Sequence, residues 1–242
     1  MSDRPMTLLA VMAHPDDEAF GVSGTLARYR GAGRRTALIC ATRGEAGQTA
    51  GLADSPAALA ELRSEELRCS AQVIGLDALY VLDYPDGGAA AWDLAALTAQ
   101  LRGLIDALRP EVVVTFDEHG VTHHPDHIAV HRAVVDAIRA APDHLGVRRL
   151  FYQVVVCRED GNPEGEEIAC VSPDAIEATV DIRAFEQVKR AALACHRSQS
   201  ADTAHFLSLP EGSIAEEHYV LAWDADGWQP PAGCDDLFAG LS

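Results

Sequence analysis

The sequence predicts an α/β fold with a Rossmann-like, mostly parallel sheet flanked by helices, followed by a C-terminal extension of short strands and a helix. Short apolar runs alternate with longer stretches of helical periodicity up to residue 141, which is the pattern of successive βαβ units. After residue 150 this alternation ends, and short strand-like segments follow one another. Folds of this class often exceed about 200 residues without dividing. We therefore expect one domain over residues 1–242.

The parallel part of the sheet is predicted by four apolar runs, at residues 7–13, 36–41, 78–82 and 111–116. Helical periodicity follows each of these runs, at residues 19–30, 57–74, 94–108 and 128–141. Strands that alternate with helices in this way pair in parallel and are joined by right-handed crossovers.

The C-terminal extension is predicted from shorter segments. Strand patterns cover residues 150–156, 168–171, 178–180 and 218–223, and a helical pattern covers residues 184–196. The later strands either extend the main sheet or form a small antiparallel annex, and the pattern fits both. We expect an exposed loop at residues 158–167 and an irregular tail from Asp224, because both segments are rich in charged residues, glycine and proline.

The charge of the chain excludes two classes of partner. The formal net charge is −18 and the pI is about 4.8, and the acidic residues are spread along the sequence. Nucleic acids and anionic membranes both require a basic face, so neither is expected as a partner. An acidic surface of this kind mainly confers solubility. No segment approaches the roughly 20 apolar residues of a membrane helix, so we expect no membrane insertion.

The cysteines and the N-terminus predict a reducing, cytoplasmic location. No two cysteines form a Cys-x-x-Cys pair, and their spacing is not that of a disulfide framework. Several lie in apolar stretches, so we expect small buried core residues. The apolar run after Pro5 is too short for a signal peptide. The six cysteines are Cys40, Cys69, Cys157, Cys170, Cys195 and Cys234.

The strongest functional signal is a tight turn directly after the first predicted strand. Residues 13–18 read Ala-His-Pro-Asp-Asp-Glu, which places His14, Asp16 and Asp17 between that strand and a helix. In open α/β sheets, ligands bind beyond the carboxyl ends of the strands, where this turn lies. One aspartate would suffice to cap the helix, so two acids beside a histidine favour metal binding.

A second polar cluster follows the fourth predicted strand. Residues 124–127 read His-Pro-Asp-His and precede a helical stretch in which Pro125 would lie in the first turn. Two strand ends of one parallel sheet therefore offer imidazole and carboxylate groups to a shared crevice. These donors suit a catalytic zinc ion with three protein ligands and an open position for water, one ion per chain. No Gly-x-Gly-x-x-Gly follows the first strand, so no dinucleotide cofactor is expected.

Four motifs in this order make the sequence resemble the LmbE-like (PIG-L) N-acetylglucosaminyl deacetylases. They are residues 13–18, Thr-Arg-Gly-Glu-Ala-Gly at 42–47, Tyr-Pro-Asp-Gly at 84–87 and residues 124–127. The resemblance runs from about residue 8 to 133 and returns more weakly at residues 189–199 and 218–223. In length the chain is closest to the bacillithiol-type deacetylases. The resemblance implies a zinc-dependent hydrolase that removes the N-acetyl group from an N-acetylglucosaminyl glycoside or conjugate.

The resemblance also implies roles for residues of the two clusters. His14, Asp17 and His127 correspond to the zinc ligands, and Asp16 corresponds to the general base that takes a proton from the attacking water. The alternative is that Asp16 binds the metal while Asp17 caps the helix. Fe2+ and other divalent ions suit the same donors.

His124 and Asp126 would complete the catalytic set. His124 either binds the metal together with His127 or points at the substrate carbonyl. The family places it in the second position, where it can stabilise the oxyanion or protonate the leaving amine. Asp126 would orient His124 or one of the metal ligands.

Three further residues are implied in substrate binding. In the family, an arginine of the second helix reaches the sugar hydroxyls, and here this residue is Arg63. Without the resemblance, a helical arginine is expected on the surface. Glu45 and Asp86 are turn acids by their local sequence and partners of sugar hydroxyls by their family position.

Other residues near these motifs carry weaker expectations. His123 departs from the family, which commonly has glycine before His-Pro-Asp-His, and this affects the shape of the loop and the fit of the substrate. His131 lies one turn beyond His127, and we expect an ordinary histidine on the helix surface. His196 and Gln199 match a later family element to which no role is assigned.

The partner implied by the resemblance is a small-molecule amino sugar, and assembly into a homo-oligomer is left open. A second enzyme function is an amidase that cleaves sugar-thiol S-conjugates. A different class is a non-catalytic carbohydrate-binding or metal-binding protein. A phosphoesterase is disfavoured, because phosphoryl hydrolysis usually recruits two metal ions and the clusters supply ligands for one.

Overall fold

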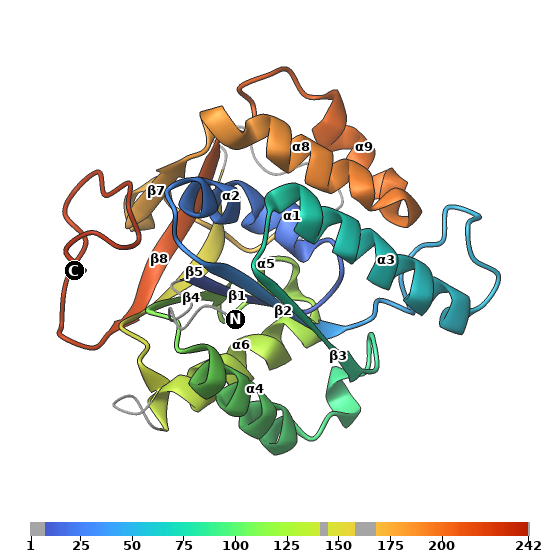
Figure 1. The fold of residues 1–242 in the computed structure, drawn as a ribbon, viewed down its shortest axis with the longest axis horizontal. Coiled ribbons are helices and arrows are strands. Elements are labelled where there is room, and N and C mark those ends of the chain that lie inside the picture. The colour runs from blue at the N-terminus through green and yellow to red at the C-terminus, as the bar shows by residue number, and fades with distance from the viewer. Residues whose placement is uncertain (1–7, 141–144, 158–167, 242) are drawn as a thin grey trace.

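The structure, a computed structural model, describes residues 8–140, 145–157 and 168–241. Its centre is a sheet in the order β3-β2-β1-β4-β5-β8-β7, with β6 paired to β5 outside this path (Figure 1). The strands are β1 (Leu8–Met12), β2 (Thr36–Thr42), β3 (Ala78–Tyr84), β4 (Val112–Phe116), β5 (Arg149–Val156), β6 (Cys170–Val171), β7 (Ala178–Asp181) and β8 (Glu216–Asp224). All pairs among β1 to β5 are parallel, which confirms the predicted fold class.

The C-terminal strands extend the main sheet and do not form a separate annex. β8 pairs antiparallel with β5 and with β7, so the sheet is mixed at this end. β6 adds a short parallel pair to the end of β5. The loop predicted at residues 158–167 lies outside the described residues, as do Thr7 and residue 141 at the ends of predicted elements.

Two layers of helices cover the sheet. The α-helices are α1 (Asp17–Gly21), α2 (Ser23–Gly31), α3 (Pro56–Ile74), α4 (Leu94–Leu108), α5 (Gly120–His123), α6 (Pro125–Arg139), α8 (Glu186–Cys195) and α9 (Ser200–Ser208). Short 3-10 turns are η1 (Ala89–Ala91), η2 (Pro173–Ala175), η3 (Arg183–Phe185) and η4 (Arg197–Gln199). One face of the sheet is covered by α1, α2, α3, α8 and α9, and the other by α4 and α6 (Figure 1).

The helix predicted at residues 19–30 is divided in two. Val22, between α1 and α2, has a φ of −141° that is not helical. Gly21, Ser23 and Gly24 surround the break, and residues of these types have low helix propensity. Gly24 also lies against Ile182, where an added Cβ would be 2.2 Å from the side chain.

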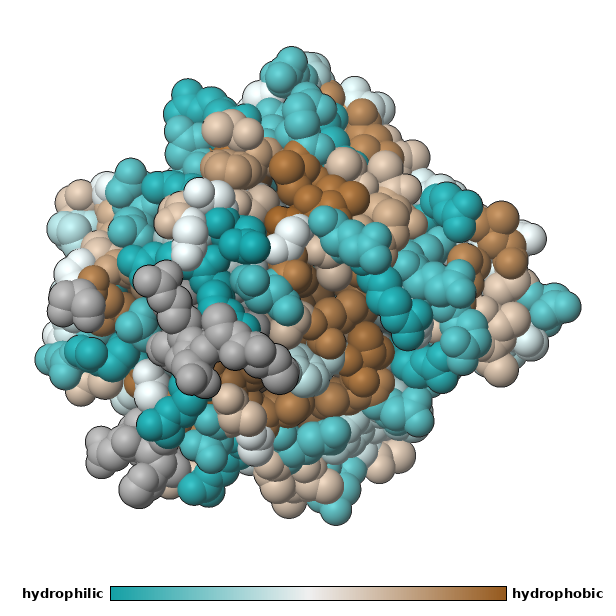
Figure 2. Space-filling view, in the orientation of Figure 1, coloured by the Kyte–Doolittle hydropathy of each residue, from teal (hydrophilic) through white to brown (hydrophobic). Residues whose placement is uncertain are grey.

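The core follows from the apolar runs. Every residue of β1, β2 and β4 is buried, because helices cover both faces of these strands. Most of the buried hydrophobic residues belong to one cluster. Figure 2 shows apolar side chains gathered near the centre of one face, over the sheet, with hydrophilic residues around them. Among the described residues, no helix is long and apolar enough to cross a membrane.

The expectation that all six cysteines are free core residues is wrong for four of them. Cys69 bonds Cys195 with a Cα–Cα distance of 5.8 Å, and Cys157 bonds Cys170 with a Cα–Cα distance of 4.9 Å. Cys40 and Cys234 are free and buried, as expected. The Cys69–Cys195 disulfide could not be predicted from the sequence, because the two residues are 126 positions apart and become neighbours only when α3 packs on α8.

Candidate metal centre

The two polar clusters meet at the switch point of the sheet. β1 pairs with β2 on one side and with β4 on the other, so the chain leaves these strands in opposite directions and opens a crevice beyond their carboxyl ends. His14 and Asp17 lie on the turn after β1, and His127 lies in the first turn of α6. Pro125 occupies the first turn of this helix, as predicted, and the ring nitrogen Nδ1 of His124 caps it by accepting from the backbone N–H of Asp126 at 3.2 Å.

The three predicted ligands come together with the spacing of a tetrahedral metal site. His14 Nδ1 lies 3.0 Å from His127 Nε2. Asp17 places Oδ2 at 3.6 Å from His14 Nδ1 and Oδ1 at 3.3 Å from His127 Nε2. Ligand atoms about 2.0–2.1 Å from a tetrahedral zinc ion are about 3.3 Å from one another. The distances that join the two rings and Asp17 Oδ1 therefore fit a single ion. Asp17 would bind it through Oδ1, because Oδ2 accepts from the backbone N–H groups of Ala13 at 3.1 Å and His14 at 2.7 Å.

The positions of the ring protons strengthen this assignment. His127 Nδ1 lies 2.9 Å from the carbonyl oxygen of Gly120, which only accepts, so this nitrogen carries the proton and Nε2 presents a lone pair. His14 Nε2 lies 3.0 Å from Asp86 Oδ1 and 3.2 Å from Asp126 Oδ2, so Nε2 keeps its proton and Nδ1 is the nitrogen that can give up its proton to bind a metal. In that state two nitrogen lone pairs and the Asp17 carboxylate would face one another, which is the donor set of a divalent cation.

The charges at this point also demand a cation. Burial alone would lower the pKa of His14, but hydrogen bonds to Asp126 and Asp86 raise it from 6.5 to about 10. Burial would raise the pKa of Asp17, but the neighbouring His127 and His14 rings lower it, so this carboxylate stays ionised. A metal ion bound here would supply this positive charge in place of the second proton of the His14 ring, which would be released.

Two carboxylates on the far side of His14 orient this ring. Asp126 is fully buried, and its oxygens accept from the backbone N–H groups of Gly87 at 2.7 Å and Ala89 at 3.0 Å as well as facing His14. Asp86 also accepts from the N–H of Ala46 at 3.0 Å. Two groups of side chains, His14 with His124 and His127, and His14 with Asp86 and Asp126, place donor atoms close enough together to hold a metal ion. The lone pairs of the two carboxylates are directed at N–H groups, however, so this pair fixes the ring in the manner of carboxylates behind metal-bound histidines.

The structure thus places Asp86 against His14, a contact that the sequence did not predict. Glu45 supports Asp86 from the neighbouring loop, because its Oε1 accepts from the Asp86 N–H at 2.9 Å. For Asp126, two alternatives were open, and its carboxylate faces His14 and not the ring of His124.

Asp16 lies on the same turn but faces Arg63. Its backbone has a φ of 126°, which is in the left-handed region, and its Oδ2 accepts from Arg63 Nη2 at 3.0 Å. Burial raises the pKa of Asp16 from 3.8 to about 7, Arg63 opposes this shift, and the charge of Asp17 adds to it. A carboxyl group with a pKa near neutrality is suited to accept and return a proton.

Arg63 is buried at the crevice and not on the surface, where an arginine of a helix ordinarily lies. It is 3% exposed, and it donates to the carbonyl oxygens of Pro15 at 2.5 Å and Gly44 at 3.0 Å. An added Cβ at Gly44 or Gly47 would lie 2.5 Å or 2.3 Å from its guanidinium. The glycines of the motif at residues 42–47 therefore make room for this side chain.

His124 presents a hydrogen-bond donor. Its Nδ1 accepts from the backbone, so in the neutral ring the proton is on Nε2. The ring is half-buried and its centroid lies 4.6 Å from that of His14. Burial and the neighbouring His14 and His127 rings lower the pKa of His124. Of its two predicted positions, this tautomer favours contact with a substrate oxygen over metal binding.

Four further residues are located by the structure. His131 is buried, with Nδ1 3.0 Å from the carbonyl oxygen of Phe116, so the expected surface position is wrong, because this side of α6 faces the sheet. His123 is exposed with a φ of 56°, a conformation that favours the glycine common in the family. Gln199 donates to the carbonyl of Gln48 at 2.6 Å and so fastens the long loop after β2. His196 is buried and lies 2.7 Å from Glu18.

Glu18 is the buried acid that sequence reasoning missed. It is the last residue of the motif at 13–18, but in sequence it is indistinguishable from an ordinary acid in the first turn of a helix. The structure buries it completely, behind Asp16 and against His196 and Ser70. The signal that could have found it was its place in the motif together with the unassigned match at His196.

Comparisons with known proteins address the family and the fold. Residues 9–138 match the model of the PIG-L family, described as GlcNAc-PI de-N-acetylase. The 1D-myo-inositol 2-acetamido-2-deoxy-alpha-D-glucopyranoside deacetylase of Nocardia farcinica is 32% identical, in an alignment that covers 100% of this chain and 98% of the relative.

Solved structures show the same architecture. The N,N'-diacetylchitobiose deacetylase from Pyrococcus horikoshii matches with a TM-score of 0.69 at 20% identity, over 90% of this chain and 84% of the other. The 4-carboxy-2-hydroxymuconate hydratase GalB from Pseudomonas putida KT2440 matches with a TM-score of 0.69 at 18% identity, over 96% of this chain and 100% of the other. These two likenesses show the fold alone. Because the two names state different reactions, the reaction has to be argued from the site.

Proposed function

The chain belongs to the PIG-L family, and from this premise we propose that it is a zinc-dependent N-acetylglucosaminyl deacetylase. The proposed substrate is a small glycoside or conjugate of N-acetylglucosamine, the class that includes the inositol glycoside named for the Nocardia farcinica relative. The products are acetate and the free amine. One hydrophobic cluster that contains most of the buried apolar residues supports treating residues 1–242 as one domain.

The observation that carries the proposal is the convergence of three side chains whose nitrogen and carboxylate atoms are of the types that bind a divalent cation. His14 Nδ1, His127 Nε2 and an oxygen of Asp17 would bind the ion. When bound, Zn2+ supplies the Lewis acidity that makes water a nucleophile at neutral pH. Two histidines and one carboxylate leave a fourth position open, as in other catalytic zinc sites.

Asp16 would act as the general base. Its carboxylate adjoins the ligand Asp17 in sequence but pairs with Arg63, so it is free to face the attacking water. It takes one proton from this water and returns it to the leaving amine nitrogen as the C–N bond breaks. Arg63 would orient this carboxylate, and the sugar-binding roles of Arg63, Glu45 and Asp86 stay predictions.

His124 would stabilise the oxyanion. Its ring centroid lies 4.6 Å from that of His14 and 5.1 Å from that of His127, and an Nε2–H donor beside these rings would meet the negative charge that develops on the acetyl oxygen. Asp126 would maintain the orientation of His14 throughout the reaction, because it also bonds two backbone N–H groups.

A substrate comparison tests the proposal. We expect the zinc-loaded protein to release equal amounts of acetate and primary amine from an inositol glycoside of N-acetylglucosamine. A chelator should abolish this release, and added Zn2+ should restore it. Amine release without acetate, and only from sugar-thiol S-conjugates, would identify the amidase instead. Sugar and metal binding without amine release from either compound would identify a non-catalytic binding protein.

A further inference from the structure

A buried carboxylate connects the general-base turn to two helices. Glu18 is fully buried, and its Oε2 accepts from the backbone N–H of Asp16 at 3.1 Å. Its Oε1 accepts from Ser70 Oγ of α3 at 2.5 Å and faces His196 Nε2, which follows α8, at 2.7 Å. The left-handed backbone of Asp16 is thus maintained by contacts that depend on how α3 and α8 are placed.

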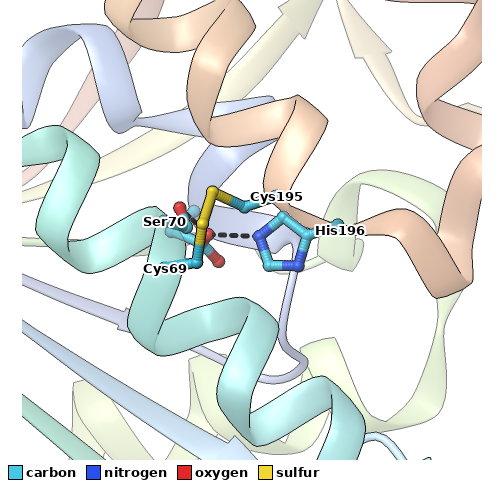
Figure 3. The surroundings of a disulfide bond; sticks show 5 residues. Cys69, Ser70, Cys195 and His196 are labelled. Atoms are coloured by element: carbon cyan, nitrogen blue, oxygen red, sulfur yellow. Dashed lines mark hydrogen bonds and ion pairs between the residues drawn. A yellow bond between two sulfur atoms is a disulfide. The ribbon is translucent and has the colours of Figure 1, made fainter.

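A disulfide joins these helices beside the two donors. Cys69 immediately precedes Ser70, and Cys195 immediately precedes His196. Figure 3 shows the disulfide next to both side chains, with His196 directed at the carboxylate between the helices. The cross-link therefore fixes the separation of the two residues that bond Glu18 Oε1.

The disulfide can be reached from solvent. Cys69 is exposed, whereas Cys195 is 8% exposed. Both lie on the wall of a surface pocket of about 370 Å³ between α3 and α8, which Arg197 also lines. An attacking thiolate can therefore approach the Cys69 sulfur through this pocket. Exposed disulfides are more easily reduced than buried structural ones.

We propose that the Cys69–Cys195 disulfide is a redox-modification site that controls deacetylation by positioning Asp16 through Ser70, His196 and Glu18. The reaction partner is a thiol reductant. Its thiolate attacks Cys69 Sγ, and the sulfur of Cys195 leaves and takes up a proton. A second thiol of the reductant then releases the Cys69 thiol, so two electrons and two protons pass to the protein and the reductant becomes a disulfide.

The inference rests on the proposed function, and it makes Glu18 and His196 positioning residues. Reduction removes the covalent link between α3 and α8 but leaves the metal ligands untouched. Reduction should therefore displace Asp16 from its position for proton transfer, while the affinities for substrate and metal should not change. A displacement of the base by a fraction of an ångström lowers kcat, because proton transfer is sensitive to distance.

The experiment compares the zinc-loaded protein before and after treatment with dithiothreitol. Alkylation and mass measurement count the thiols, and hydrogen exchange follows the backbone around Asp16. We expect kcat to fall roughly tenfold on reduction, with KM changed less than about twofold and zinc content unchanged. Reoxidation should restore kcat, and hydrogen exchange at Asp16 should be faster in the reduced protein.

Two double variants serve as matched controls. Cys69→Ser/Cys195→Ser should have the low kcat of the reduced protein and should not respond to dithiothreitol, which also corrects for zinc removed by the reductant. Cys157→Ser/Cys170→Ser, which removes the other disulfide, should keep the full response. Equal kcat in both redox states, or a response that persists without Cys69 and Cys195, would overturn the inference alone. If neither the oxidised nor the reduced protein releases acetate, the proposed function fails. If hydrogen exchange at Asp16 is also the same in both redox states, the inference fails as well.

Discussion

Two buried clusters of charged side chains lie at the two ends of α1, and they differ in whether a fixed cation satisfies their charges. In the first, Lys189 of α8 donates to Glu217 of β8 at 2.6 Å and to the carbonyl oxygen of Phe20 at 2.6 Å. Glu217 also accepts from the backbone N–H groups of Gly24 at 3.1 Å and Thr25 at 2.8 Å. Every contact in this cluster joins a donor to an acceptor.

The second cluster is the predicted metal centre, where two imidazole nitrogens and a carboxylate converge. His14 Nδ1 and His127 Nε2 lie 3.0 Å apart beside the carboxylate of Asp17. Both clusters are buried and charged, so these two properties alone do not distinguish a functional site from a structural ion pair. The difference is that the positive charge of the metal centre comes from a protonated His14, which a metal ion can replace, and not from a lysine or arginine.

The largest effect is expected from Asp16→Asn, which removes the base but no ligand. General-base catalysis contributes about 10²–10⁴-fold, so kcat should fall by that factor. Zinc content should remain at the wild-type level, because the amide leaves His14, Asp17 and His127 in place. Amine release and metal analysis of the same preparation make the measurement. Loss of zinc in this variant would show that Asp16 is a ligand, the alternative interpretation of the motif.

The satisfied cluster should respond in stability and not in metal binding. Lys189→Met leaves Glu217 buried without its cation, which typically costs about 3–5 kcal/mol of unfolding free energy. Chemical denaturation measures this loss, and Lys189→Met/Glu217→Gln should recover part of it, because the buried charge is removed while the amide oxygen can still accept from a backbone N–H group. Zinc bound per folded molecule should not change. A zinc deficit in the folded fraction would mean that the two clusters are coupled.

Asp126→Asn should weaken metal binding without destroying the site. The amide keeps the shape but loses the charge that orients His14, and changes behind a metal ligand typically cost about 10–100-fold in affinity. Competition with a zinc-binding dye measures this change. Asp136→Asn, an exposed carboxylate further along α6, is the matched control and should leave the affinity unchanged.

A smaller effect is expected from the ion pair between Arg149 and Asp224, which is satisfied like Lys189–Glu217. Burial would raise the pKa of Asp224, but Arg149, 2.9 Å away, and the N–H groups of Trp228 and Asp226 lower it. Its stabilising contribution is therefore complete above the unfolded pKa of about 4 and is lost as the pH falls through the lower folded value. Asp224→Asn should be less stable than wild type at pH 7, and this difference should shrink towards pH 2. A constant difference would contradict the assignment.

The first half of the fold and the meeting of the two motifs were predictable from the sequence. Fully buried parallel strands such as β1 and β4 are continuous apolar runs, and their carboxyl ends must lie at one edge of the sheet. That rule alone brings His14 towards His127 from 113 residues away.

The remaining features of the fold and of the site depend on tertiary contacts that produce no local sequence pattern. β8 is placed by antiparallel pairing with β5, the Cys69–Cys195 disulfide by the packing of α3 on α8, and Asp86 by the turn after β3 that carries it to His14. Each is decided by tertiary packing between segments far apart in sequence. The protons on His14 and His127, which carry the case for a metal, follow only from such contacts.

Metal analysis of purified wild type, His14→Ala and His127→Ala tests the central claim most directly. Inductively coupled plasma mass spectrometry should find about one divalent ion per wild-type chain, because the three donors fit one tetrahedral ion. Both variants should fold and lose this ion, since each removes one of the lone pairs that converge on it. A wild-type protein that binds no ion after incubation with Zn2+, or variants that keep full occupancy, would contradict the ligand set.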